Sequence, residues 1–421
     1  MPVKSILNSQ AIDALLLEAE ASLTQEFQRI EQNCHQNTQK VLEAFKACGL
    51  DDSHFYSVTG YAHNDMGREA TDAIFANVFG ADSACVRLQF VSGTHAIAAA
   101  LRGCLAPGKK LISLTGAPYD TLEPVIGKRE RSAQSLTRWG VSYDEIDYFN
   151  DDRTETIRPF TDSEAQRIAH ADVALIQRSR GYSLRPSLSV SEIQSMIHAA
   201  KSINPNLLVI VDNCYGEFIE TLEPTAVGAD LIAGSLIKNP GGGIVPTGGY
   251  IAGRQDLVES AAESLTAPGL GTDGGYTFDA TRVILQGLYL APMIVREAQK
   301  GMRLFAAVFE NLGYDITPST KSPQNDIIQA IQLENEVNIL AFCKALQAAS
   351  PVGSKLTPIP AVTPGYESPV VMAGGTFIFG STIELSADAP IREPYTVFVQ
   401  GGLNYSHTRY TLSKVIEAIN E

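Results

Sequence analysis

Residues 207–243 read LLVIVDNCYGEFIETLEPTAVGADLIAGSLIKNPGGG, and the two apolar runs in this stretch decide the fold. The runs, 207–211 and 231–232, are short and rich in branched side chains, as strands buried on both faces of a parallel sheet are. The first run ends in Asp212, and the second leads to Lys238 and three glycines. A carboxylate at the end of such a strand lies where α/β proteins bind ligands.

Strands and helices alternate around this stretch. Further strand-like runs occur at residues 110–114 and 173–176, and a helix over 189–203 follows the second of them. Ser189 and Glu192 provide a capping box at the start of that helix. The strand–helix–strand order predicts an α/β layer with right-handed crossovers.

The pattern of elements divides the chain into three parts. Residues 1–59 form a helical arm, with apolar residues at helical spacing up to Ile30 and a second short helix that stops near Gly49. This arm is expected to pack on the rest of the chain or on a neighbouring subunit. Residues 60–295 carry the alternating strands and helices of a large α/β domain. Residues 296–421 predict a smaller α+β domain with helices over 302–312 and 337–349, strands over 326–333, 376–385 and 396–400, and a closing helix.

The composition restricts the class of protein. Of the 421 residues, 44% are hydrophobic, and 32 Lys and Arg against 47 Asp and Glu give a net charge of −15. This charge argues against a general binder of nucleic acids or anionic membranes. No run approaches the roughly 18 apolar residues of a membrane span, and the N-terminus lacks the apolar core of a signal peptide. The six cysteines form no C-x-x-C pair, so reduced, mostly buried thiols and a cytoplasmic location are expected.

A turn of small residues, Ser92-Gly93-Thr94, leads into an alanine-rich helix. Free N–H groups at a helix N-terminus bind anions such as phosphate. The alternative is an ordinary helix cap by Ser92 or Thr94. His95 is either a further member of the site or simply part of the first helical turn.

Four more side chains follow strand-like runs. Asp212 either faces a ligand or caps the next turn. Lys238 lies between an apolar run and three glycines, and burial there predicts a lowered pKa that suits Schiff-base chemistry; a surface lysine is the alternative. Tyr119 follows the run at 110–114 and either stacks on a flat ring or fills a core or loop position. Cys214 is interpreted as a small buried residue, since no base accompanies it in the sequence.

Together these features match pyridoxal 5′-phosphate. The lysine would hold its aldehyde as a Schiff base, the acid would pair with the pyridinium nitrogen, and the helix N-terminus would bind the phosphate. A nicotinamide-binding Rossmann enzyme is disfavoured because the turn at residues 90–95 is not the glycine fingerprint of dinucleotide-binding proteins.

Seven stretches carry a resemblance to a known family. They are YSVTGYAHNDMGREATDAIFA, QFVSGTHAI, TGAPYDTLE, QRSRGYSLRPSL, VDNCYGEF, GSLIKNPGGGIVPTGGYIAGR and APIREPY, and they span about residues 56–395. On these motifs the chain resembles the fold-type I pyridoxal-phosphate enzymes and, more closely, the methionine γ-lyase-like or aluminium-resistance family of carbon–sulfur lyases. The resemblance implies a large α/β domain with a mostly parallel sheet and a small C-terminal α+β domain.

The resemblance also implies roles for individual residues. Lys238 would form the Schiff base and then move the Cα proton, Asp212 would hold the pyridinium nitrogen, and Tyr119 would stack on the ring and assist the leaving group. The residues implied at the phosphate are Ser92, Gly93, Thr94 and Ser235. Ile237 stands where related lyases often carry a hydroxyl, so one phosphate contact is missing or replaced.

Tyr61 and Arg68 stand in the region from which the wider family brings a tyrosine and an arginine of a neighbouring subunit to the phosphate. Arg68 equally suits a solvated helix charge or a pair with Asp65. The substrate α-carboxylate requires a guanidinium fork. The arginine candidates are Arg392 first and Arg409 second for the carboxylate, with Arg178 and Arg180 facing the cofactor. For each of these, a structural ion pair is the alternative.

The implied function is a lyase that acts on a sulfur-containing amino acid by β- or γ-elimination and releases a thiol, ammonia and a keto acid. Transamination and γ-replacement share the first steps and are the alternatives among enzymes. A non-catalytic pyridoxal-phosphate-binding protein with a stress-related role is the alternative outside them. Because sites of this family lie at a subunit boundary, a homodimer or homotetramer is expected.

Overall fold

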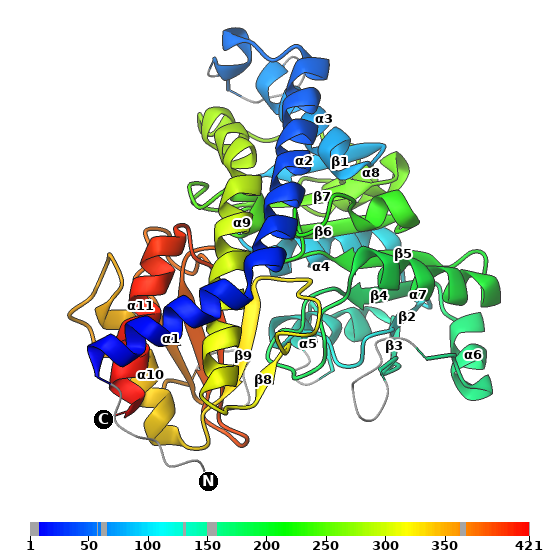
Figure 1. Cartoon of the computed structure of the whole chain (residues 1–421). Coiled ribbons are helices and arrows are strands. Elements are labelled where there is room, and N and C mark those ends of the chain that lie inside the picture. The colour runs from blue at the N-terminus through cyan, green and yellow to red at the C-terminus, as the bar shows by residue number, and fades with distance from the viewer. Residues whose placement is uncertain are drawn as a thin grey trace. The chain divides into compact units, whose positions relative to one another are not determined.

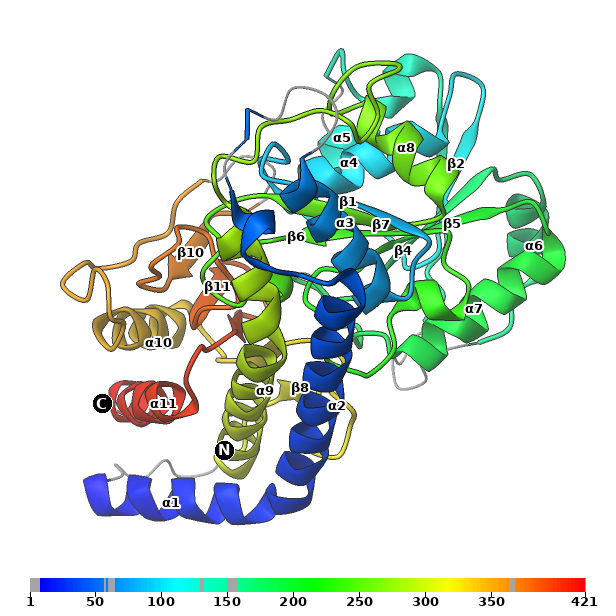
Figure 2. The same ribbon diagram turned by 90° about the horizontal axis from the view of Figure 1, so that it is seen from above.

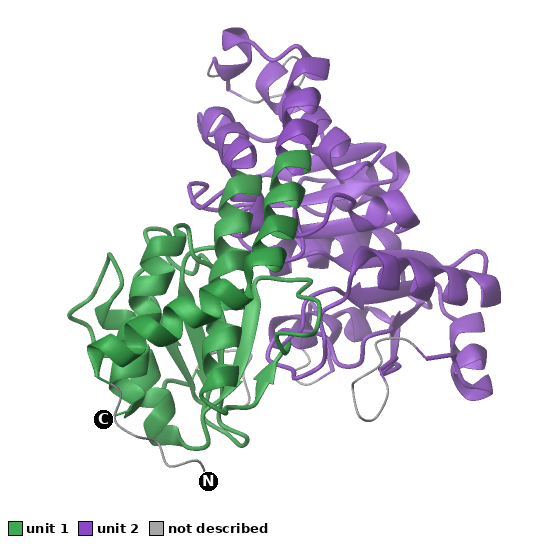
Figure 3. Ribbon diagram, in the orientation of Figure 1, with its two compact units in different colours: residues 1–36, 291–421 green, residues 37–290 purple. Residues whose placement is uncertain are grey.

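The computed structural model describes residues 8–56, 58–59, 65–128, 132–149, 158–362 and 368–420. The chain divides into two compact units: unit 2 is residues 37–290, and unit 1 is residues 1–36 with 291–421 (Figure 3). The three-part domain division stays a prediction; by its contacts, the start of the chain belongs with unit 1. Within the described residues, no helix is both long and apolar enough to cross a membrane.

A seven-stranded sheet forms the centre of unit 2 (Figure 1). Its strands are β1 (Ser83–Arg87), β2 (Lys110–Ser113), β3 (Ser142–Glu145), β4 (Val173–Gln177), β5 (Leu208–Asp212), β6 (Leu231–Ser235) and β7 (Gly249–Gly253). They lie in the order β1-β7-β6-β5-β4-β2-β3. Neighbours from β6 to β3 are parallel, whereas β7 is antiparallel to both β6 and β1. The predicted α/β class with a mostly parallel sheet is confirmed.

Helices cover both faces of this sheet. They are α3 (Met66–Phe79), α4 (Gly93–Cys104), α5 (Glu123–Ile126), α6 (Asp162–Ala169), α7 (Val190–Ile203) and α8 (Gln255–Glu263). Figure 2 shows α4 and α8 on one side of the strands and α6 and α7 on the other. Leu101 and Val258 of α4 and α8 share one buried cluster with Leu175 and Ile210 of the sheet. Because both faces are covered, the central strands β4 and β5 are nearly continuous apolar runs instead of alternating.

The capping box at the start of α7 is confirmed. Ser189 Oγ accepts the N–H of Glu192 at 3.2 Å, and the Glu192 carboxylate accepts the N–H of Ser189 at 2.7 Å. These two bonds satisfy donors that a helix start otherwise leaves without an intrahelical partner. The helix therefore begins where the sequence places it.

The N-terminal helices break at a different point from the one expected. Helix α1 (Ser9–Ser22) ends at Leu23, and α2 (Thr24–Cys48) then continues to the predicted stop before Gly49. The prediction of a separate short helix around Val41 is wrong. Apolar spacing continues across Leu23, so periodicity alone does not show the change of direction between α1 and α2.

Unit 1 has a five-stranded antiparallel sheet in the order β10-β11-β12-β9-β8. Its strands are β8 (Ile316–Thr317), β9 (Ile328–Gln332), β10 (Val370–Ala373), β11 (Ser386–Pro390) and β12 (Thr396–Gln400). Helices α9 (Thr281–Asn311, from residue 291), α10 (Glu336–Ala348) and α11 (Tyr405–Asn420) accompany α1 in this unit. Leu16 of α1 is buried with Phe305, Phe342 and Leu412 in one apolar core. The predicted small α+β layer is confirmed.

The strand predicted over residues 376–385 is wrong. This segment is a loop between β10 and β11. Gly374 and Gly380 adopt φ angles of 150° and 78°, which turn the chain out of an extended path. The buried Glu384 carboxylate then accepts the N–H groups of Phe377 and Ile378 at 2.8 and 2.9 Å. These donors are therefore used inside the loop and not in a ladder.

The close packing of α4 on α8 generates a stability prediction. A Cβ on Gly103 would lie 2.6 Å from the backbone nitrogen of Ala261 and 2.7 Å from its Cα. Gly103→Ala is therefore expected to lower the free energy of unfolding by about 1–3 kcal/mol, measured by urea denaturation. Gly274→Ala, whose added Cβ meets nothing nearer than 3.8 Å, is the control and should stay within about 0.5 kcal/mol of wild type. Equal losses in the two variants would contradict the packing argument.

Candidate cofactor site

Helix α4 begins with the predicted small-residue turn. Ser92 is its N-cap, and Ser92 Oγ accepts the N–H of His95 at 3.1 Å. Thr94 shares a hydrogen bond of 2.7 Å with the hydroxyl of Thr121. The ordinary-cap interpretation is thus correct for Ser92, and no described residue accepts the N–H groups of Gly93 and Thr94. Those two groups remain suited to an anion.

Ser235 ends β6 against this turn. Its side chain is 1% exposed, and its Oγ has no hydrogen-bond partner among the described residues. A Cβ on Gly93 would lie 3.1 Å from Ser235 Cβ and 3.4 Å from Cys214 Sγ, so a side chain there would be tightly packed and glycine leaves room for this close approach. Buried hydroxyls nearly always have a partner, so a ligand atom at the start of α4 would explain this one.

Asp212 ends β5, and the structure shows the turn cap, which is one of the two functions that the sequence left open. Its Oδ1 accepts the N–H of Cys214 at 3.1 Å, which caps the next turn. The carboxylate is 6% exposed; burial raises its pKa, and the charge of Lys238 opposes that shift. The acid therefore caps the turn and interacts electrostatically with the lysine. Burial also raises the pKa of the Cys214 thiol well above its ordinary value, in keeping with a small buried residue.

Lys238 follows β6, and its Nζ lies 3.9 Å from the centroid of the Tyr215 ring. Burial alone would lower the pKa of its ammonium group, but the surrounding ionisable groups, Asp212 and Glu217 among them, raise it above the ordinary value. The predicted lowering is therefore wrong. The sequence shows the apolar run before the lysine but not the acids that the fold brings around it.

Tyr119 is held at the same edge of the sheet. Its N–H donates to Gln177 Oε1 at 2.6 Å, and Gln177 ends β4 directly beside Asp212 of β5. The Tyr119 ring meets that of Tyr182 edge-on, with centroids 5.7 Å apart. Gly181, at φ 59°, lets the backbone pass the ring, because a Cβ there would lie 3.0 Å from it.

The structure thus brings most of the predicted cofactor residues to one edge of the sheet. They lie after the carboxyl ends of β2, β5 and β6 or at the start of α4, all within unit 2. These residues are Ser92, Gly93, Thr94, Tyr119, Asp212, Ser235 and Lys238. Their roles stay predictions.

The arginines after β4 differ in their surroundings. Arg178 has no exposed surface and forms ion pairs with Glu220 at 3.0 Å and Glu223 at 3.2 Å, so the structural interpretation is correct for it. Arg180 is also buried, at 1% exposed, and stays a candidate.

The remaining candidates come from other elements of the chain. Arg68, in α3, is 3% exposed and donates to the carbonyl of Gly275 at 3.4 Å, so the solvated interpretation is wrong. Tyr61 lies outside the described residues. Arg392 is exposed and Arg409 donates to Glu20 at 3.0 Å, and both belong to unit 1.

Two residues that the sequence analysis did not single out also belong to this edge. Tyr215 contacts Lys238, and Glu217 has no exposed surface. Glu217 Oε1 accepts the hydroxyl of Tyr250 at 2.8 Å, whereas its Oε2 has no partner among the described residues. Burial raises the pKa of Glu217 from its ordinary 4.5 to about 8. Both stand in the quoted motif VDNCYGEF, which is the signal that could have found them.

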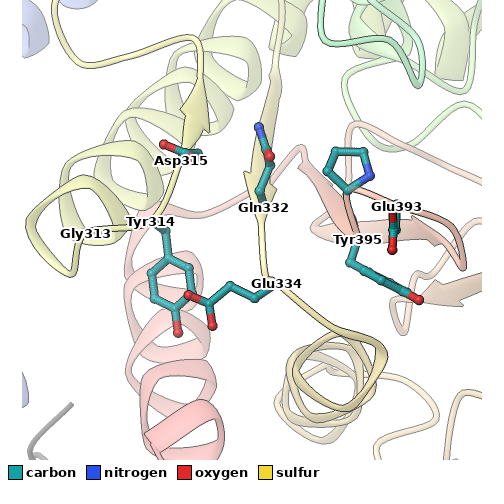
Figure 4. Close-up of a pocket in the computed structure, with 8 residues that line it drawn as sticks. Gly313, Tyr314, Asp315, Gln332, Glu334, Glu393 and Tyr395 are labelled. Atoms are coloured by element: carbon teal, nitrogen blue, oxygen red, sulfur yellow. The ribbon is translucent and has the colours of Figure 1, made fainter. Parts of the chain in front are cut away.

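A separate cavity of about 340 Å³ lies within unit 1 (Figure 4). Its lining includes the acidic residues Asp315, Glu334 and Glu393 with the rings of Tyr314 and Tyr395, and it includes no basic residue. Three acidic side chains disfavour an α-carboxylate, so this cavity does not match an amino-acid site.

The family model described as methionine gamma-lyase matches residues 12–420. The chain belongs to the methionine gamma-lyase family. A carbon–sulfur lyase involved in aluminium resistance from Clostridium novyi is 41% identical, with a TM-score of 0.91 over 97% of this chain and 96% of that one. The Bacillus subtilis protein YnbB is 42% identical over 417 residues, which are 99% of this chain and 98% of the relative. A pyridoxal-5′-phosphate dependent protein of Escherichia coli, YhfS, is 15% identical with a TM-score of 0.61 and shows the shared fold alone.

The buried Glu217 of this methionine gamma-lyase family member generates a pH prediction. Its pKa is raised in the folded protein, so the stability it contributes is full below about pH 4.5 and is lost as the pH rises through about 8. Glu217→Gln removes the ionisation. The wild type should therefore lose stability relative to this variant between pH 5 and 8, measured as the urea midpoint at each pH.

Tyr250→Phe provides the internal comparison. The Tyr250 hydroxyl lowers the pKa of Glu217 by donating to it, so its removal should extend the loss of stability to higher pH. Parallel curves for wild type and Glu217→Gln would contradict a raised pKa in the folded state.

Proposed function

We propose that this chain binds pyridoxal 5′-phosphate through Lys238 and is a carbon–sulfur lyase that acts on a sulfur-containing amino acid. Its membership of the methionine gamma-lyase family supports the proposal, as does the name of the Clostridium novyi relative. The choice between β- and γ-elimination is open within it.

The single observation that carries the proposal is the unsatisfied Ser235 hydroxyl at the start of α4. A phosphate there would accept this hydroxyl together with the N–H groups of Gly93 and Thr94. Asp212 is close enough to Lys238 to influence its pKa, and it ends the neighbouring strand β5. An anion site, a buried acid and a lysine at one edge of the sheet fit this cofactor.

When bound, the cofactor supplies an electron sink that stabilises negative charge at the substrate Cα. Lys238 would hold the aldehyde and afterwards move the proton at Cα. Asp212 would keep a negative charge beside the ring nitrogen. Tyr119 would cover the ring and help the leaving group depart.

Further parts of the proposal concern assembly and location. We propose a homodimer or homotetramer whose site is completed at the subunit boundary, with Tyr61 and Arg68 at the phosphate. The proposed ligands of the substrate carboxylate are Arg392, Arg409 and Arg180. A cytoplasmic location agrees with the six free cysteines.

The cofactor test uses visible absorbance and borohydride. Purified protein supplied with pyridoxal 5′-phosphate should show a visible band, and borohydride should fix the cofactor on the peptide that contains Lys238. Lys238→Ala should lose both signals. Lys355→Ala, at an exposed lysine of unit 1, is the control and should keep them. A wild type without band or label would overturn the proposal.

The substrate test follows with methionine, cystathionine and cysteine, assayed for thiol and keto acid. Release of both without an amino acceptor supports elimination. Keto acid formed only with an amino acceptor would instead indicate transamination. A cofactor band that no amino acid changes would favour the non-catalytic alternative.

The phosphate interaction generates a further prediction. Ser235→Ala is expected to weaken cofactor binding by about 10- to 100-fold, since it removes one hydrogen bond to a charged group. The dissociation constant is measured by titrating the protein stripped of cofactor with pyridoxal 5′-phosphate. Ser195→Ala, on the exposed side of α7, is the matched control. Unchanged affinity in Ser235→Ala would place the phosphate elsewhere.

A further inference from the structure

We propose that Tyr215 is a positioning residue that holds the ammonium group of Lys238 on the face of its aromatic ring. The inference rests on the proposed role of Lys238 and adds a residue to that site. The inference concerns Lys238 while its amine is free. The amine is free before the cofactor binds, and again after a substrate amine has replaced Lys238 on the cofactor.

The contact between the two side chains is short. Lys238 Nζ lies 3.9 Å from the Tyr215 ring centroid, and cations interact with aromatic faces at up to about 6 Å. The other lysine–ring contacts of the described residues are 5.5 to 5.9 Å long. Among the lysine–ring contacts of the described residues, that of the Lys238 ammonium is therefore the shortest.

The backbone of Tyr215 is held in an uncommon conformation. Its φ is 70°, and that of Phe218 is 64°, in the left-handed region that bulky residues rarely adopt. Such a conformation persists only where the surrounding structure enforces it, and it is concentrated at functional sites. The turn at residues 213–218 therefore holds the Tyr215 ring in place although the backbone conformation is locally unfavourable.

Contacts beneath the turn provide that enforcement. A Cβ on Gly216 would lie 2.7 Å from Cζ of Arg178, so the glycine makes room for the guanidinium group. Arg178 pairs with Glu223, and the Glu223 carboxylate accepts the N–H of Phe218 at 3.0 Å. The buried charge thereby fixes the turn on which Tyr215 stands.

A second tether joins the turn to the lysine segment. The side-chain amide of Asn239, the residue after Lys238, donates to the carbonyl of Glu217 at 2.9 Å. The ring and the lysine are therefore carried by two segments that are bonded to each other. This arrangement favours one position for a side chain that otherwise has many rotamers.

The ring also acts on the proton of the lysine. A cation on an aromatic face is stabilised relative to the neutral amine, so the ring favours the protonated form. The ionisable groups around Lys238 act in the same direction; they are Cys214 and Glu217 on the turn, the phenol of Tyr215 itself and Asp212 at the end of β5. Replacing the ring alone should change the titration of Lys238 and leave the other groups in place.

The test measures that titration in the full-length protein stripped of cofactor. Trace labelling with acetic anhydride over a pH series, read as the acetylated fraction of the Lys238 peptide by mass spectrometry, gives the midpoint at which the amine becomes free. Tyr215→Leu should lower this midpoint by about one pH unit, a ~10-fold change in the proton equilibrium. Tyr215→Phe keeps the ring and should stay within about 0.3 pH unit of wild type.

Tyr215→Asn is a second variant without a ring, and its side chain tolerates the left-handed backbone. It carries the test if Tyr215→Leu does not fold, and it should shift the midpoint in the same direction. A wild-type midpoint in both ringless variants would overturn the proposal. Equal shifts in Tyr215→Phe and the ringless variants would overturn it as well, because the hydroxyl would then be responsible.

Failure of this inference is distinguishable from failure of the proposed function. The acetylation experiment needs no cofactor, whereas the proposed function depends on borohydride fixation at Lys238. Normal fixation in wild type with no midpoint shift in the variants refutes only the role of Tyr215. Absence of fixation in wild type refutes the lyase proposal whatever the midpoints are.

Discussion

Arg178 carries a full positive charge into the interior of unit 2, where its side chain has no exposed surface. Taking such a charge out of water costs several kcal/mol unless partners replace the solvent. Two carboxylates, Glu220 and Glu223, and the side-chain oxygen of Asn213 provide those partners. All three follow β5, so the charge fixes the path of the chain after this strand. Gly216 is part of the same constraint, because any side chain there would meet the guanidinium group.

The chemistry of the site depends on this fixed path. Asp212 ends the strand, and the turn that follows presents Tyr215 to the amine of Lys238. Ser235 ends the next strand and meets the start of α4 across a glycine. The turn that carries Tyr215 and the hydroxyl of Ser235 are thereby held at neighbouring strand ends. Such an edge suits a ligand that carries both a phosphate and a group that reacts with the lysine amine.

Burial and neighbouring charges together set the pKa values of Lys238 and Glu217 at this edge of the sheet. Burial alone would favour a neutral amine, but the surrounding groups raise the pKa of Lys238 instead. The pKa of Glu217 is raised as well, toward the protonated and uncharged form, because its carboxyl group is shut off from water. Proton positions at this edge are thus decided by which groups are desolvated together. A family resemblance names the lysine, but the structure determines the charges around it.

Much of the α/β unit follows from local sequence. Unbroken apolar runs predict buried parallel strands, and the Ser189–Glu192 capping box marks the start of α7, because both signals depend on neighbouring residues alone. Motifs likewise point to Asp212, Lys238 and the turn at Ser92. The loop at residues 376–385 was predicted as a strand, since its apolar residues are visible in sequence but the Glu384 bonds that close it are not.

What only the tertiary structure decided is which distant groups meet. The contact of Gly93 with Ser235, the ring of Tyr215 on Lys238 and the burial of Arg178 each join segments from different strands or turns. A pKa or an unsatisfied hydroxyl results from all such neighbours at once. Sequence therefore determined the elements and the types of reactive residue. The fold decided their electrostatic surroundings, because electric fields and desolvation act through space and not along the chain.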